Sequence, residues 1–253
     1  MRSATAPDRG IGSGYCGGVI DDQEVNGYGN STIAVVLPPF HPRSRSSPAN
    51  FAPHDPARAR AFAQSFPTVE AVLEELPLTN AIPRSPWTRT DLDVVFVGCW
   101  GGVTAVCDFA LVDDGLDGAI LWDVTSALAQ RHPEARVVGS AHVDRGATHE
   151  ETAVHLPGGL TLHTEGWSLA DECYVDGDPH AIARELGLSA EALAEAGIDL
   201  DEEPLGVPWE HFGRQLLDPH DPWGFAELRM SAFRVRHTEK ATYHMEEIWL
   251  GGD

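Results

Sequence analysis

Cys99 is the candidate nucleophile of this sequence, because it follows an apolar run and precedes two glycines. A cysteine in a tight turn after a buried strand can attack a substrate when a histidine activates its thiol. We assign the role of that histidine to His155. The elbow that presents such a nucleophile requires small residues two positions before and two positions after it. Gly101 meets this requirement and Val97 does not, so a purely structural turn at Cys99 is the alternative.

Four histidines lie within 22 residues of chain, between His142 and His163, and Asp144 lies among them. A three-residue loop at 157–159 would place His155 and His163 on one face of a β-hairpin as diagonal neighbours, about 7–8 Å apart. Side chains at that distance can share a metal ion, although the spacing matches no zinc signature. A two-residue loop would place them on opposite faces, and exposed polar residues on a solvated hairpin are the alternative. The candidate metal ligands are therefore His142, Asp144, His155 and His163.

Acidic residues outnumber basic residues 39 to 17, and the whole excess of −22 lies in residues 91–253. Residues 165–203 alone contain 12 acids and one base, Arg184. Such a charge repels phosphate backbones, so nucleic-acid binding is not expected, and it attracts a basic protein or a cation. No EF-hand ligand pattern accompanies these acids, and solubility alone is the alternative explanation. The predicted partner-binding residues are Asp199, Asp201, Glu202 and Glu203, together with Trp223 in a turn at the surface.

The elements that must position these residues follow from hydrophobic periodicity and turn residues. Strands are predicted at 32–37, 94–97, 103–106, 136–143, 152–156 and 160–163. Helices are predicted at 56–66 and 69–76, within 113–131, and at 179–186, 190–196 and 208–217. At the C-terminus, a hairpin is predicted in which Val235 faces Tyr243 and Phe233 faces Met245.

The order of these elements indicates an α+β fold. Strands come in hairpins and helices come in clusters, which favours a mostly antiparallel sheet with helices packed on one side of it. Residues 1–30 are rich in Gly, Asp and Ser and are predicted to form a flexible arm. Residues 31–253 are predicted to form a single α+β domain.

Cysteine usage and the absence of targeting signals predict the compartment. The four cysteines lie far apart and none belongs to a Cys-x-x-Cys pair, which favours free thiols in a reducing cytoplasm. The N-terminus lacks the apolar core of a secretory signal, and no apolar segment reaches the roughly 20 residues of a membrane helix. Since the sequence shows no phosphate loop, dinucleotide fingerprint or kinase signature, neither a cofactor nor a membrane is expected as a partner.

Six short strings stand out between residue 32 and the C-terminus. They are Leu37-Pro38-Pro39-Phe40, Val97-Gly98-Cys99-Trp100-Gly101-Gly102, Glu165-Gly166-Trp167, Asp199-Leu200-Asp201-Glu202-Glu203-Pro204, Asp221-Pro222-Trp223-Gly224 and Phe233-Arg234-Val235-Arg236-His237-Thr238. Together they resemble an uncharacterised actinobacterial family of unknown function. The resemblance leaves the N-terminal arm outside, and it implies no activity, cofactor or catalytic residue.

Function is therefore predicted from the distribution of charge. The prediction is a cytosolic acidic interaction protein, similar to an immunity protein or an inhibitor, that engages a basic partner. Two alternatives stay open. One is a small-molecule hydrolase that uses Cys99 with a histidine, and the other is a metal-binding protein that uses the histidines between 142 and 163.

Overall fold

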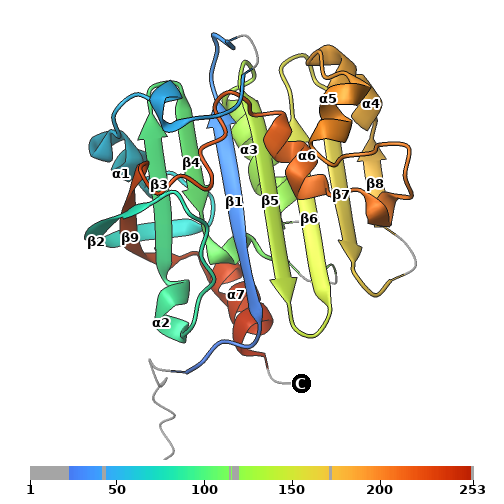
Figure 1. Ribbon diagram of the computed structural model, residues 1–253. Coiled ribbons are helices and arrows are strands. Elements are labelled where there is room, and N and C mark those ends of the chain that lie inside the picture. Colours follow the sequence, from blue (N-terminus) through green and yellow to red (C-terminus); the bar gives the residue numbers. More distant parts are fainter. Residues whose placement is uncertain (1–22, 42–43, 114, 116–119, 171–172, 252–253) are drawn as a thin grey trace, which may run out of the picture.

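One antiparallel sheet of nine strands runs through the described part of the chain (Figure 1). The computed structural model describes residues 23–41, 44–113, 115, 120–170 and 173–251. The strands are β1 (Tyr28–Val36), β2 (Val69–Asn80), β3 (Val94–Trp100), β4 (Val103–Cys107), β5 (Arg136–Asp144), β6 (Thr148–His155), β7 (Thr161–Trp167), β8 (Cys173–Gly177) and β9 (Arg229–His237). The helices are α1 (Pro56–Gln64), α2 (Arg89–Leu92), α3 (Ile120–Arg131), α4 (Pro179–Glu185), α5 (Ala190–Glu195), α6 (Trp209–Gln215) and α7 (Glu239–Leu250).

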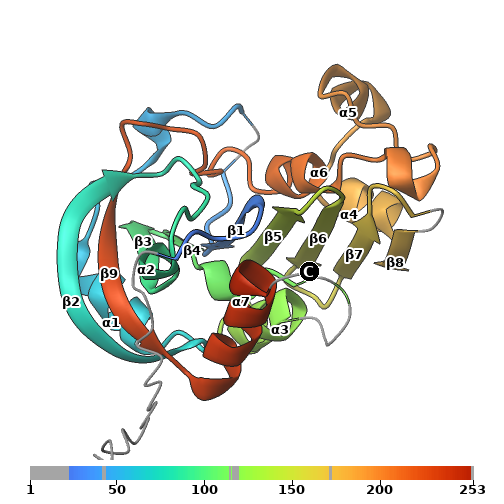
Figure 2. The ribbon, with the colours of Figure 1, turned by 90° about the horizontal axis from the view of Figure 1, so that it is seen from below.

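The strands lie in the order β2-β9-β3-β4-β1-β5-β6-β7-β8. Figure 2 shows that β2 and β9 curve strongly at one end of the sheet, whereas β5 to β8 lie flatter at the other end. β1 runs through the centre, where it pairs with β4 on one side and with β5 on the other. All five residues of β4 are buried, so the core surrounds this central part of the sheet. The predicted α+β class with an antiparallel sheet is confirmed.

Helices cover both faces of β5 and β6, and not one side only as predicted (Figure 2). A Cβ atom added at Gly139 would lie 2.8 Å from Thr125 Cγ2, so α3 packs tightly against one face of β5. A Cβ atom added at Gly213 of α6 would lie 3.1 Å from Val138 Cγ1, on the opposite face. The physical reason is that Val137 and Val138 are both buried, and a strand that is apolar on both faces needs cover on both.

Most other predicted elements are confirmed, with ends that shift by a few residues. Three predicted helix starts have the expected cap, in which a side-chain oxygen accepts a backbone N–H from the first turn. These capping residues are Asp55 for α1, Asp178 for α4 and Ser189 for α5. The cap residues therefore locate these helix ends reliably from the sequence.

The predicted helix at 69–76 is wrong, because these residues belong to the long strand β2. β2 pairs with β9, and the pairing shifts register three times, with Val69 opposite His237 and Val72 opposite Val235. Each bulge inserts a residue and interrupts the alternation of a regular strand. An irregular strand of this kind places apolar residues three or four positions apart, a spacing that resembles a helix.

The predicted C-terminal hairpin is also wrong. β9 pairs with β2 and β3, and the chain after Thr238 forms α7. The Thr238 hydroxyl accepts the backbone N–H of Ala241 and so caps this helix. Ala241, Met245 and Ile248 are buried at intervals of four and three residues, which is helical spacing. The two-residue alternation from which the hairpin was predicted matches fewer of these buried apolar residues than the helical spacing does.

The N-terminal arm predicted for residues 1–30 lies largely outside the described residues, which begin at 23. The described end of that range is attached to the fold, because Val25 N–H donates to the Trp87 carbonyl and Asn26 N–H donates to the Trp249 carbonyl. β1 starts at Tyr28, within the predicted arm. The single domain over residues 31–253 stays a prediction. Within the described residues, no helix combines the length and the apolar character needed to cross a bilayer.

Candidate functional site

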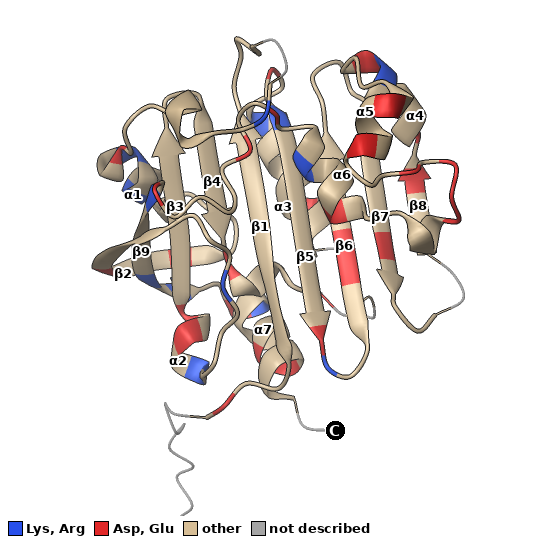
Figure 3. Ribbon diagram, in the orientation of Figure 1, with Lys and Arg blue, Asp and Glu red and all other residues tan. Residues whose placement is uncertain are grey.

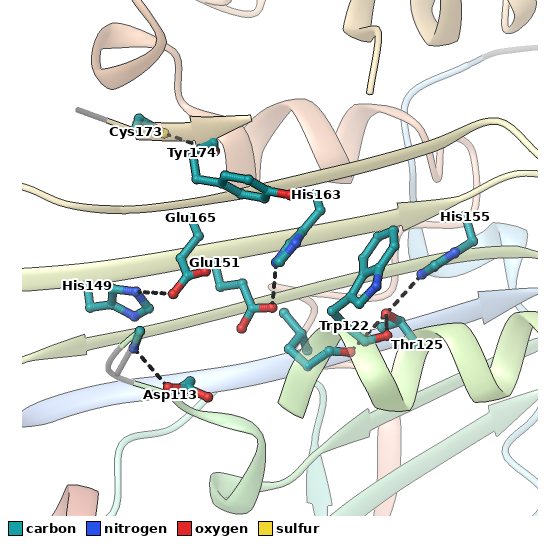
Figure 4. A network of polar contacts seen from close by, with 12 residues as sticks. Asp113, Trp122, Thr125, His149, Glu151, His155, His163, Glu165, Cys173 and Tyr174 are labelled. Carbon is teal, nitrogen blue, oxygen red and sulfur yellow. Dashed lines mark hydrogen bonds and ion pairs between the residues drawn. The ribbon is translucent and has the colours of Figure 1, made fainter. Parts of the chain in front are cut away.

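A buried polar network lies between α3 and the outer strands β6 and β7 (Figure 4). Strand residues alternate between faces, and Ala153 on β6 lies opposite His163 on β7. This register places five polar side chains on the face covered by α3. They are His149, Glu151 and His155 of β6, with His163 and Glu165 of β7.

The network contains two histidine–glutamate pairs, each of which joins β6 to β7. His149 Nε2 lies 3.2 Å from Glu165 Oε1, and His163 Nε2 lies 2.9 Å from Glu151 Oε1. Glu151 and Glu165 lie directly opposite each other, an arrangement that destabilises two like charges. Each glutamate therefore takes a histidine from the neighbouring strand as its diagonal partner.

Trp122 of α3 closes the network. Its ring centroid lies 4.5 Å from that of His155 and 4.8 Å from that of His163. The Thr125 hydroxyl donates to the Leu121 carbonyl, so it accepts a hydrogen bond from His155 Nε2, 3.1 Å away. The two histidine rings therefore contact α3 directly, and a substrate would have to displace Trp122 to reach them.

Burial and neighbouring charges separate the pKa values within the network. Burial, helped by His163, lowers the pKa of His155 to about 4, so its ring is neutral at pH 7. Burial opposes the charged form of His149, but hydrogen bonding to Glu165 and the charge of that carboxylate outweigh this and raise its pKa. Burial raises the pKa of Glu151, against the opposing hydrogen bond from His163. Groups with divergent pKa values can serve as acid and base, but the ring of His155 lies against Trp122.

The four predicted metal ligands do not converge. His155 and His163 lie on one face as diagonal neighbours, because the loop between their strands has three residues, which was one of the two alternatives. Gly139 of β5 faces α3, and successive residues of a strand point to opposite faces. His142 and Asp144 are odd numbers of residues from Gly139, so they lie on the face away from α3. Among the described residues, no group of three or more His, Cys, Asp or Glu side chains has a geometry that could hold a metal ion.

Cys99 lies inside β3 and not in the turn that was predicted to present it. Its side chain is fully buried, Sγ lies 3.7 Å from Thr104 Oγ1, and burial raises the pKa of the thiol. The imidazole of His54 contacts Cys99 through the backbone, since its Nδ1 accepts the backbone N–H of Cys99. His155 is on β6, separated from β3 by three strands, or about 19 Å at the usual strand spacing. The predicted Cys99–His155 pair is therefore not formed.

We expect Cys99 and Cys107 to resist alkylation in the folded protein. Both thiols are buried, and burial raises the pKa of Cys107 to about 12, so neither provides the thiolate that reacts. Cys173 is only partly buried and should react first of the three cysteines in the described residues. Timed iodoacetamide labelling with peptide mass spectrometry measures these rates, and the unfolded chain in guanidinium is the control. Labelling of folded Cys99 at the unfolded rate would contradict this expectation.

The second candidate site is an acidic lobe, which we define as residues 173–203, comprising β8, α4, α5 and the turn after α5. It contains nine acids against a single Arg184. All nine acids are exposed. Figure 3 shows acidic residues along β8, α4, α5 and the segment that follows α5. They are Asp176, Asp178, Glu185, Glu191, Glu195, Asp199, Asp201, Glu202 and Glu203.

Among the described residues, five arginines pair with acids outside the lobe, namely Arg60, Arg89, Arg214, Arg234 and Arg236. On β2 and β9, Arg236 pairs with Glu70 at 2.8 Å and Arg234 pairs with Glu74 at 3.4 Å. In the acidic lobe, His180 Nε2 lies 3.6 Å from Asp201 Oδ1, and both side chains are exposed. The sequence predicted an uncompensated negative surface, and the four predicted acids from Asp199 to Glu203 are exposed on it.

Trp223, the fifth predicted partner-binding residue, is not at the surface. Only 5% of it is exposed. Its carbonyl accepts a hydrogen bond from Arg214, and Arg214 also pairs with Asp221 at 2.7 Å. This pair folds the turn inward, which the turn residues alone did not reveal. Trp223 is therefore part of the core.

Sequence reasoning missed the two glutamates of the network and Trp122. A signal for the glutamates was present, because His149-x-Glu151 and His163-x-Glu165 repeat the same spacing on both strands of one hairpin. In an antiparallel pair, two such repeats place each histidine diagonal to the glutamate of the other strand. No comparable signal linked Trp122 to the hairpin, because α3 is distant from it in sequence.

Comparison with known proteins gives a family and no activity. Residues 16–252 match a family described as a family of unknown function (DUF6333). No curated protein and no solved structure matches the chain. The predicted resemblance to a family of unknown function is confirmed, and the match begins at residue 16 instead of 32. An actinobacterial source stays a prediction.

Proposed function

The chain belongs to this family of unknown function, and we propose that it is an acidic interaction protein that engages a basic protein partner through the acidic lobe. One observation carries the proposal. The nine acids of the lobe are exposed, with Arg184 as the single arginine or lysine among them. The mode of action would be that of an immunity protein or an inhibitor, which covers a basic surface of its target.

The electrostatics of the lobe support this assignment. Exposed charges of one sign steer an oppositely charged partner and raise its association rate about 10- to 1,000-fold at low salt. The same field repels the phosphates of nucleic acids. Arginines such as Arg60, Arg234 and Arg236 already pair with acids of β2, so they do not neutralise the lobe.

We propose the cytoplasm as the compartment in which this interaction occurs. Cys99, Cys107 and Cys173 are free thiols, which is the state of cysteine in a reducing environment. Cys16 lies outside the described residues.

The proposal is tested with two variants that remove the same number of charges. The lobe variant combines Asp201→Asn, Glu202→Gln and Glu203→Gln, three exposed acids. The control variant combines Glu70→Gln, Glu74→Gln and Glu75→Gln, three acids of β2 that each lie beside an arginine. Both changes raise the net charge by three, so a difference between them reports position and not total charge.

The wild type and both variants are immobilised and incubated with a lysate of the source cells, and captured proteins are purified and retested one to one by calorimetry. We expect a basic partner that binds the wild type and the control at about 0.1 M salt, binds the lobe variant at least tenfold more weakly, and dissociates near 1 M salt, where the Debye length falls from about 10 to about 3 Å. A partner that binds all three proteins equally, or no partner at all, would contradict the proposal.

A further inference from the structure

A cavity of about 170 Å³ opens beside the acidic lobe, between β6, β7 and β8 and the segment 204–209. It lies on the face of the sheet opposite the histidine network, because Thr152 and Thr164 in its wall have the opposite parity to His149 and His163. A cavity of about 150 Å³ holds a benzene ring. The space here therefore suits one side-chain head group and not a large ligand.

Two threonines lie in the cavity wall. Thr152 and Thr164 lie directly opposite each other on β6 and β7, and they are 2% and 1% exposed. Neither hydroxyl makes a hydrogen bond within the described part of the chain. Because both threonines line the cavity, their hydroxyls are available to accept hydrogen bonds from an occupant that supplies donors.

The cavity also presents a carboxylate and an aromatic ring. Glu150 lies in the wall, and Gly166 opposite it on β7 has no side chain to fill the space. Trp209 of α6 forms a further part of the wall, with its indole N–H donated to the Pro204 carbonyl. An aromatic ring beside a carboxylate favours a cation as the occupant.

The charges around the cavity are negative. No lysine, arginine or histidine is among the described residues that line it. Glu150 and Glu165 lie near enough to the Cys173 thiol that, together with burial, they raise its pKa. Arg214 shares the neighbouring depression with Glu150, but it is held by Asp221 and by the Trp223 carbonyl. The cavity therefore has negative charge without a cation of its own.

We propose that this cavity receives one arginine side chain of the basic partner, with its guanidinium against Glu150, Thr152 and Thr164. The guanidinium carries five N–H donors in a flat fork, so it can satisfy both hydroxyls and the carboxylate while it stacks on Trp209. A buried arginine in a pocket is a common anchor of a protein interface. This inference rests on the proposed function and adds to it the side chain that would fix the position of the partner.

The first experiment needs no partner. Arginine methyl ester is titrated into the isotopically labelled full chain, and amide and indole shifts are followed by NMR. We expect millimolar binding, with the largest shifts at Thr152, Thr164 and the Trp209 indole. Citrulline methyl ester, in which an uncharged urea of similar shape replaces the guanidinium, should bind at least tenfold more weakly. Lysine methyl ester should bind more weakly than arginine methyl ester, because its ammonium has three donors and no flat fork.

Two variants test the residues in the wall. Glu150→Gln removes an exposed carboxylate, and Thr152→Val with Thr164→Val removes both hydroxyls while it keeps β-branched side chains in the strands. Each variant should bind arginine methyl ester about tenfold more weakly than wild type, whereas Glu185→Gln in the lobe should leave the affinity unchanged. The result for the double threonine variant is used only if its far-ultraviolet circular dichroism spectrum and melting temperature match those of wild type. If they do not match, the Glu150→Gln variant alone provides the test.

The two proposals can fail separately. If arginine methyl ester does not bind, or binds wild type and Glu150→Gln equally well, the proposed arginine pocket is wrong. The acidic lobe would remain the proposed binding surface. The lobe variant tests the acidic surface independently, because its three substitutions lie outside the residues that line the cavity. A partner that binds the Thr152→Val, Thr164→Val protein as tightly as wild type would also overturn the pocket.

Discussion

Replacing His237 by alanine is expected to lower the free energy of unfolding by about 3–5 kcal/mol. His237 Nε2 lies 3.0 Å from Asp108 Oδ1, and both side chains are completely buried. Removal of the imidazole leaves the Asp108 carboxylate in the core without its counter-charge. The hydrogen bonds from the Thr68 hydroxyl and the Ala110 backbone N–H remain, but they do not neutralise it.

This pair joins segments that are distant in sequence. Asp108 follows β4 and His237 ends β9, and Thr68 precedes β2. Burial opposes ionisation of Asp108, but the charge and hydrogen bond of His237 outweigh it and lower the pKa of the carboxyl. Burial likewise opposes the charged imidazole of His237, but Asp108 raises its pKa. The contribution of the pair is therefore lost as the pH falls through the pKa of Asp108 or rises through that of His237.

Urea unfolding followed by circular dichroism measures the loss. Arg236→Ala is the matched control, because it breaks the exposed Arg236–Glu70 pair and should cost at most about 1 kcal/mol. The double variant Asp108→Ala, His237→Ala should cost less than the sum of its single variants, since no unpaired charge remains. A loss below about 1 kcal/mol for His237→Ala would contradict the role of the pair.

The free energy of unfolding is expected to fall by about 3 kcal/mol as the pH drops from 6.5 to 4, through His155 alone. The pKa of His155 is lowered to about 4 by burial and by His163, whereas the unfolded chain takes up this proton near pH 6.5. Between these values the unfolded state binds more protons than the folded state, so stability is present above pH 6.5 and is lost on acidification.

A difference between variants isolates this contribution from the many carboxylates that titrate in the same range. In His155→Gln the decrease between pH 6.5 and 4 should be about 3 kcal/mol smaller than in wild type. His142→Gln is the control for the loss of an imidazole, because His142 lies on the other face of the sheet. Urea unfolding at intervals of pH measures both, and equal slopes in wild type and His155→Gln would show that His155 is not held neutral.

Local signals in the sequence were sufficient where one contact decides the structure. The loop at 157–159 set the register that makes His155 and His163 diagonal neighbours, and Asp178 located the start of α4. The charge of residues 165–203 also predicted an exposed acidic surface, because so many like charges without counter-ions cannot be buried.

Other features depend on tertiary contacts that no local pattern contains. The bulges of β2 arise from pairing with β9, and Trp223 is buried because Arg214 and Asp221 hold its turn inward. The cavity beside the lobe is formed by β6 to β8 together with residues 204–209, so its wall exists only after the fold is complete. Cys99 was predicted to lie in the turn after a strand at 94–97, but β3 extends to Trp100 and therefore includes it.

The central claim is that the acidic lobe guides a basic partner, and the association rate constant tests it most directly. Stopped-flow mixing of the purified partner with wild type, the lobe variant and the β2 control is repeated at about 0.1 M and about 1 M salt. We predict a wild-type rate constant that falls at least tenfold with salt, a lobe variant that is at least tenfold slower at low salt, and a control like wild type. Rate constants that are the same for all three proteins, or that do not change with salt, would contradict the account.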